Sequence, residues 1–202
     1  MPFISKKRFY DQYLKPSFQA RPDVVLLFLS LQLITTTPPA DSKSPRTALY
    51  HTAKHFHLEL EGSGLFTILI LQAGVLLALY ELGHGIYPAA YLTIGACARY
   101  AYALGIGAGS LMNKRRVLTR VEIEEQRRVW WSIVILDRFV SIGSPGRPFA
   151  TAEPRFDDIF PTDDASWNEG HSRCFTYSVD FVKKLLRDRS ISTCQSCDRP
   201  NL

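Results

Sequence analysis

Asp137 is the residue of this sequence best placed to carry chemistry, because it stands inside an apolar run. The stretch from Arg127 to Pro148 reads RRVWWSIVILDRFVSIGSPGRP, and "DR" supplies its only charges between Arg128 and Arg147. A charge in apolar surroundings is costly unless it is paired or serves a site. The pattern leaves three explanations open: a catalytic carboxylate, a buried structural ion pair, and a helix lying on a membrane.

A structural ion pair is the explanation that we favour for Asp137. A catalytic carboxylate needs a second acid, a base or a metal beside it, and the sequence offers no obvious second member. We expect the GRP turn to direct Arg147 back at the helix, where its guanidinium would bind the carboxylate, with Arg138 or Arg99 as substitutes. Arg138 is adjacent in sequence and should point elsewhere on the helix. Under this hypothesis Arg147→Met costs ~3–5 kcal/mol and unfolds the domain.

Other residues of the kinds that perform chemistry do not form a convincing site. His51 and His55 stand four apart, a spacing that can hold a metal, and Cys194 and Cys197 form a CxxC pair. The two pairs lie far apart in sequence, so we expect a solvated histidine face and a frayed thiol pair. GxSxG, P-loop and HExxH motifs are absent from the sequence. The sequence therefore predicts no catalytic residue, no metal ligand, no cofactor in this chain and no enzyme.

Composition restricts the class of protein. The chain has 202 residues, a formal net charge of +5 and four cysteines, which suits one reduced intracellular domain or a piece of a larger one. The longest apolar runs, Val24–Ile34 and Leu65–Tyr80, are shorter than the ~20 residues that a membrane span needs. We expect both to be core helices, and no membrane partner. The short basic runs Ser5–Arg8 and Met112–Arg116 could aid nuclear import or contact phosphates. We expect both to be solvated loops.

The elements that must position Asp137 are helices punctuated by proline and glycine. Long apolar runs without alternation favour an all-α fold, an irregular multi-helix bundle. The capping box formed by Thr119 and Glu122 opens the helix that contains Asp137. We expect Glu124 and Arg128 to pair at the exposed start of that helix, and the apolar part that follows to be central in the fold. The predicted helices are Asp23–Thr35, a helix capped by Ser44 with Pro45 at its first position and ending at Gly62, Leu65–Leu82, a helix opened by Pro88, the helix from Thr119 to Gly143, and residues 175–189.

The same residues carry a resemblance to a known family. RRxWW, LDR and GRP occur in this order, with a proline several residues on, and LQAGVLLALYELGHGIYPAAYLTIGACARYAYALGI precedes them. This arrangement resembles the fungal-specific transcription factor domain, the middle regulatory region of fungal zinc binuclear-cluster transcription factors. The likeness covers about half the chain, from Leu65 to Pro161. Its structural motif comprises Arg127, Arg128, Trp130, Trp131, Asp137, Arg138, Gly146, Arg147 and Pro148.

The resemblance implies a nuclear, sequence-specific regulator of RNA polymerase II transcription, represented by a truncated version of a larger helical domain. It implies an N-terminal lead-in over residues 1–43, the domain core over 44–165 and an atypical or truncated tail over 166–202. In the family, DNA and two zinc ions are bound by a six-cysteine module that lies N-terminal to this region. The first cysteine here is Cys97, so we expect DNA contact only through a module missing from this chain. A small-molecule effector, a homodimer and transcriptional co-regulators are the other partners implied.

One alternative function remains open at this stage. A helical bundle can enclose a ligand pocket, so the chain could be a small-molecule-binding protein or an enzyme with a site near Asp137 and Arg147.

Overall fold

The computed structural model describes residues 2–14, 21–37, 44–107, 118–142, 146–155 and 158–168. All regular elements in these ranges are helices, which confirms the all-α prediction. They are α1 (Lys6–Arg8), the π-helix η1 (Phe9–Tyr13), α2 (Pro22–Thr35), α3 (Ala48–Gly62), α4 (Ile68–Gly83), α5 (Ala89–Ala103), α6 (Arg120–Ile142) and α7 (Asp164–Asn168).

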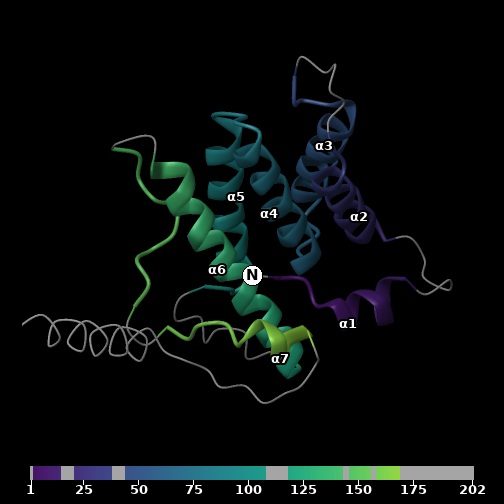
Figure 1. Cartoon of the computed structure of the whole chain (residues 1–202), viewed down its shortest axis with the longest axis vertical. Coiled ribbons are helices and arrows are strands. Elements are labelled where there is room, and N and C mark those ends of the chain that lie inside the picture. The colour runs from purple at the N-terminus through teal and green to yellow at the C-terminus, as the bar shows by residue number, and fades with distance from the viewer. Residues whose placement is uncertain are drawn as a thin grey trace, which may run out of the picture.

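Helix α4 is the centre of the bundle. It contacts α2, α3, α5 and α6, with α2 and α3 on one side and α5 and α6 on the other (Figure 1). Its sequence ILILQAGVLLALYELG is apolar on nearly every side, and most of its residues are buried. The core helix predicted in the run Leu65–Tyr80 is therefore confirmed from Ile68 onward. Within the described ranges, no helix combines the length and apolar character needed to cross a membrane.

Two helices begin later than the sequence predicted. Thr47, not Ser44, caps α3, because its hydroxyl accepts the N–H of Tyr50 at 3.2 Å. Similarly, α4 begins at Ile68 because Thr67 provides the cap. A hydroxyl that accepts a free N–H of the first turn fixes where a helix begins, and the hydroxyls of Thr47 and Thr67 accept such N–H groups.

The capping box at the start of α6 is confirmed. Oε2 of Glu122 accepts the backbone N–H of Thr119 at 2.9 Å, and the Thr119 hydroxyl accepts the N–H of Glu122 at 3.2 Å. Helix α6 then runs to Ile142. The predicted stop residue Gly143 lies outside the described residues. So do Cys194, Cys197, the basic run Met112–Arg116 and the predicted helix over 175–189.

Helix α6 is central on one face only. Val129 and Ile133 are fully buried against the bundle, as the prediction requires. Ile135, Phe139 and Ile142 lie on the opposite face and are 45%, 58% and 74% exposed. The expectation of a helix surrounded by protein is wrong for this second face.

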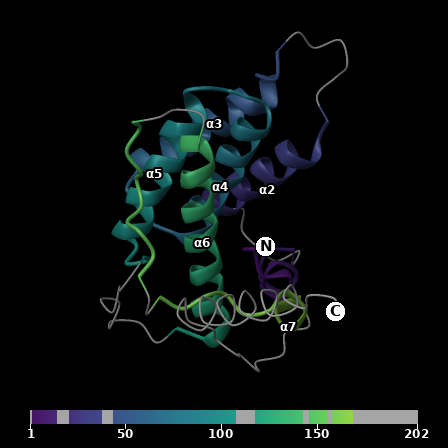
Figure 2. The same cartoon turned by 60° about the vertical axis from the view of Figure 1, so that its left-hand side comes forward.

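After α6 the chain turns back and runs along it. We call the described residues of this return, 146–155 and 158–168, the strap. It descends beside α6 and ends in α7, near the start of α6 and close to the N-terminal segment, residues 2–14 (Figures 1 and 2). Several of the residues that hold the strap in place belong to the sequence motif.

Candidate functional site

Asp137 holds the upper part of the strap. Its side chain is fully buried, as predicted for a carboxylate within an apolar helix. Oδ2 accepts the backbone N–H and the hydroxyl of Thr151, at 2.9 and 2.7 Å, and Oδ1 accepts the N–H of Ala150 at 3.2 Å. Nη1 of Arg138 also donates to Oδ2 at 3.0 Å. These donors satisfy the buried charge.

The predicted pairing of Asp137 with Arg147 is wrong, and its substitute Arg138 is found instead. The Arg138 side chain curls back over the strap, where it also donates to Thr151 Oγ1 and lies 3.9 Å over the ring of Phe149. Because the long side chain of Arg138 can fold back along the helix, Arg138 reaches both Asp137 and the Thr151 hydroxyl that Asp137 binds.

Arg147 faces α5, not α6. Its guanidinium lies 5.1 Å over the ring of Tyr91, whose hydroxyl donates to the carbonyl of Pro148 at 3.1 Å. Gly146 precedes it with φ +85°, a left-handed conformation that side chains rarely adopt. The GRP residues therefore shape the turn that leads the strap past α5.

Trp131 holds the middle of the strap. Its indole Nε1 donates to the carbonyl of Ile159 at 2.9 Å, and its ring stacks on Phe160 at 4.5 Å. Trp130 packs on the other side, edge to face with Tyr102 of α5 at 5.2 Å. The two tryptophans thus serve different surfaces, the strap and the α5–α6 contact.

Glu124 and Arg128 hold the lower end of the strap. They form the predicted ion pair, at 3.0 Å, but they are buried and not exposed as predicted, because the strap covers them. Oε1 of Glu124 accepts the N–H and the hydroxyl of Thr162, at 2.7 and 2.9 Å. Arg128 donates to the carbonyl of Thr162 and to the carboxylate of Asp164, both at 2.5 Å. Arg127 adds a bond to Oε2 of Glu124 at 2.6 Å.

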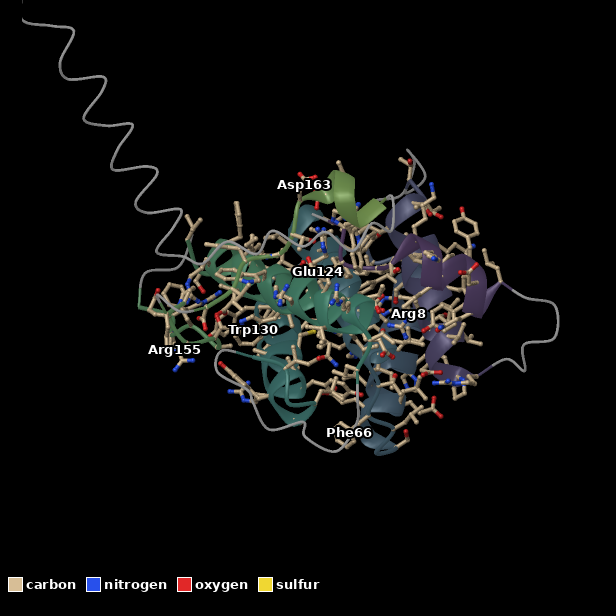
Figure 3. All side chains as sticks on the ribbon, turned by 90° about the horizontal axis from the view of Figure 1, so that it is seen from below. Arg8, Phe66, Glu124, Trp130, Arg155 and Asp163 are labelled. Atoms are coloured by element: carbon tan, nitrogen blue, oxygen red, sulfur yellow. The ribbon has the colours of Figure 1, made fainter. Side chains whose placement is uncertain are left out.

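The N-terminal segment reaches the same end of α6. Oε1 of Glu125 accepts the N–H of Ser5 at 3.0 Å, and its other oxygen pairs with Arg8. Nη1 of Arg128 donates to the carbonyl of Pro2 at 3.0 Å. This end faces the reader in Figure 3, where Arg8, Glu124 and Asp163 are labelled. In the run Ser5–Arg8, Ser5 is buried and Arg8 is paired, whereas Lys6 and Lys7 are exposed. The expected solvation is therefore found for the two lysines, but they lie in helix α1 and not in a loop.

A second buried polar cluster, which the sequence analysis missed, joins α3, α4 and α5. Glu81 of α4 is fully buried and receives the Tyr50 hydroxyl and the Lys54 ammonium, each at 2.9 Å, and also the Thr93 hydroxyl. Burial and the bond to Glu81 raise the pKa of Tyr50. The signal was available, because Glu81 is an acid within an apolar helix, as Asp137 is.

His57 and Cys97 flank Gly74 at the interior of the bundle. A methyl group on Gly74 would lie 2.7 Å from His57 Nε2 and 2.8 Å from Cys97 Sγ. Burial lowers the pKa of His57 to about 4 and raises that of Cys97 to about 12. Both groups are therefore neutral at physiological pH, and Cys97 is not a reactive thiol.

The geometry does not resemble a catalytic centre. The motif residues of α6 bind the chain's own backbone and side chains, and the buried carboxylates of Asp137 and Glu124 are saturated with donors. His51 and His55 are exposed on α3. Within the described ranges no group of three histidine, cysteine, aspartate or glutamate side chains could hold a metal ion. What the motif does, in chemical terms, is to clamp two chain segments onto α6.

Comparison with known proteins identifies the family. The family model described as "Fungal specific transcription factor domain" matches residues 1–197. The chain belongs to this family. The resemblance carried by the α6 motif is thereby confirmed, and the match extends well beyond Leu65–Pro161. In this fungal transcription factor domain, four motif residues of α6 fasten the strap: Arg128, Trp131, Asp137 and Arg138.

Two relatives carry the names of transcription regulators. "Transcription factor BOA15" of Botryotinia fuckeliana is 43% identical over 106 residues, which cover 52% of this chain and 59% of that protein. "Uncharacterized transcriptional regulatory protein C530.05" of Schizosaccharomyces pombe is 24% identical over 169 residues, which cover 79% of this chain and 21% of that protein. The matched parts thus span about three fifths and one fifth of these relatives. No solved structure matches the chain. The findings support a fungal transcription regulator rather than an enzyme.

Proposed function

We propose that this chain is the regulatory domain of a sequence-specific RNA polymerase II regulator of the zinc-cluster family, and that it acts in the nucleus. The observation that carries the proposal is that the residues of the α6 motif bind other parts of this chain. Two of the motif's charged residues, Asp137 and Arg128, are fully buried and hold the strap, which favours a motif that builds a domain over one that forms a reaction site. Membership of the fungal transcription factor domain family supports the same function.

We assign contact with DNA to a zinc-cluster module outside this chain. Such a module binds two zinc ions through six cysteines and places a helix in the major groove. Cys97, the cysteine that the structure describes, is buried and alone. The described residues therefore do not fit the family's zinc. The helical domain would instead modulate transcription by binding an effector or a co-regulator, or by forming a homodimer.

A reporter assay in a fungal cell tests this proposal. The 202-residue chain is fused to a heterologous DNA-binding module and a fluorescent protein, and transcription is measured from a promoter that carries the module's site. We expect nuclear fluorescence and a change in transcription relative to the module alone. The same fusion with Asp137→Ala, which should unfold the domain, is the matched control. A wild-type fusion that is excluded from the nucleus, or that leaves transcription equal to that of the module alone, contradicts the proposal.

One observation favours a second function, a small-molecule site beside Arg147. Nη1 of Arg147 is buried and has no hydrogen-bond partner among the described residues. An anionic ligand could satisfy it. Titration of the chain with acetate and with inorganic phosphate, followed by the melting temperature, tests this. A rise in melting temperature that Arg147→Met abolishes supports the site, and an identical rise in that variant rejects it.

A further inference from the structure

Arg128 touches three separate parts of the chain. Through Nε it binds Glu124 of its own helix, at 3.0 Å. Through Nη1 it binds the carbonyl of Pro2 in the N-terminal segment, at 3.0 Å. Nη1 and Nη2 also bind Asp164 and the carbonyl of Thr162 in the strap, both at 2.5 Å. The ring of Trp167 covers the guanidinium at 4.8 Å.

This arrangement uses the whole donor capacity of the side chain. A guanidinium has five N–H groups, and the carbonyl of Asp163 accepts the fifth, at 3.4 Å. The side chain is 0% exposed. A buried cation is stable only while its partners remain and water is excluded. If either segment leaves, the cation becomes partly unpaired and hydrated, and the bonds to the other segment weaken.

Adjacent acids strengthen the connection between the two segments. Glu124 binds the strap through Thr162, while Glu125 binds the N-terminal segment through Ser5. Glu125 in turn pairs with Arg8. The strap and the N-terminal segment therefore share a single turn of α6 and cover the same buried charges.

We infer that Arg128 couples the strap to the N-terminal segment, so that release of one loosens the other. The coupling is reciprocal, because a free-energy coupling between two sites acts equally in both directions. It goes beyond the proposed function and stands on the geometry of this chain alone. Its meaning for gene control rests on the proposed function, since a DNA-binding module that precedes the domain would connect through the N-terminal segment.

Hydrogen exchange on the full 202-residue chain tests the coupling without DNA. The strap-side variant is Asp164→Ala, whose side chain is 52% exposed, so its removal leaves no internal void. We expect the backbone amides over residues 3–9, which include the Ser5 N–H bound to Glu125, to exchange about fivefold faster or more. In the reciprocal variant Arg8→Ala, the amides over 159–168 should exchange faster by a similar factor.

Thr151→Val is the matched control. It loosens the strap at its other end, because Thr151 binds Asp137 and Arg138. The hydrogen bonds and ion pairs described for these two residues do not include the N-terminal segment. Residues 3–9 should exchange in this variant as they do in the wild type. The inference is overturned if Asp164→Ala leaves residues 3–9 unchanged, if Arg8→Ala leaves the strap unchanged, or if Thr151→Val accelerates residues 3–9 as much as Asp164→Ala does. Because none of these readouts involves DNA or transcription, the proposed function can fail while the coupling stands.

Discussion

Thr151 donates twice to a single oxygen of Asp137, through its backbone N–H at 2.9 Å and its hydroxyl at 2.7 Å. Thr162 does the same to Oε1 of Glu124, at 2.7 and 2.9 Å. A threonine that donates in this way fixes its side chain and its backbone at once. The strap is therefore tied to α6 at both ends by the same arrangement, and we call each one a threonine clasp.

The upper clasp predicts a large cost for Asp137→Ala. The substitution leaves two backbone N–H groups and the Thr151 hydroxyl without their acceptor in a buried place. We expect the free energy of unfolding to fall by ~3–5 kcal/mol, the range seen when one partner of a buried charged network is removed. Urea denaturation followed by circular dichroism measures it.

Arg147→Met is the contrasting variant. Arg147 contacts the Tyr91 ring and forms no ion pair with Asp137 in the described structure. Losing a cation–π contact should cost ~0.5–2 kcal/mol. If Arg147→Met is as destabilising as Asp137→Ala, the assignment of the two residues to separate contacts is wrong.

The two halves of the Asp137 prediction differed in outcome for a physical reason. That the carboxylate is buried and paired follows from the apolar residues around it in sequence, since burial of a bare charge is prohibitive. Its partners depend on where the returning chain passes, and Thr151 carries no sequence signal for that. Glu124 and Arg128 show the same limit. Their spacing predicted the ion pair correctly, but their burial depends on a strap and an N-terminal segment that arrive from distant parts of the sequence.

The contacts of Arg128 at the lower end of the strap predict that Arg128→Lys is not a conservative change. Lysine has three donors on one atom and lacks the planar fork that binds Glu124, Pro2 and Thr162 together. We expect a loss of ~2–4 kcal/mol in the free energy of unfolding, because several buried acceptors lose their donor.

Arg127→Ala serves as the neighbouring control for Arg128→Lys. Arg127 makes one described bond, to Oε2 of Glu124, and its side chain is 19% exposed. Arg127→Ala should therefore lower the free energy of unfolding by ~1 kcal/mol or less. Equal losses for the two variants in the same denaturation experiment would show that Arg128 has no special role as a junction.

His57 predicts a loss of stability in mild acid. Burial is the main cause that lowers its pKa from 6.5 to about 4, with the charge of Lys54 adding to it. The unfolded chain therefore binds this proton more readily than the folded chain. The contribution that neutral His57 makes to the free energy of unfolding is fully present above about pH 6.5, and it is lost as the pH falls from there toward 4. Between pH 7 and pH 5 we expect a loss of ~2 kcal/mol from this group.

His57→Gln is the variant that isolates the titration. It is itself destabilising, so the relevant quantity is the difference between its unfolding free energies at pH 7 and pH 5. That difference should be smaller than in the wild type by ~2 kcal/mol. An identical pH dependence in the two proteins would assign the acid sensitivity to other groups.

The surroundings of Gly74 predict that α4 needs a glycine at this position because its neighbours pack closely, and not because the backbone must be flexible. An alanine methyl there would lie 2.7 Å from Nε2 of His57 and 2.8 Å from Sγ of Cys97. Both neighbours are buried, at 5% and 2% exposure, so neither can move aside easily. We expect Gly74→Ala to lower the free energy of unfolding by ~1–3 kcal/mol through overpacking, despite alanine's higher helix propensity.

Gly83→Ala, in the same helix, should have the opposite sign. A methyl at Gly83 would meet nothing within 4 Å, and this glycine does not have a positive φ. The substitution should therefore stabilise the protein by ~0.5–1 kcal/mol, because alanine loses less backbone entropy in a helix. Thermal denaturation of the two variants measures the contrast. If Gly74→Ala melts at or above the wild-type temperature, the α3–α4–α5 interface is looser at this point than the distances imply.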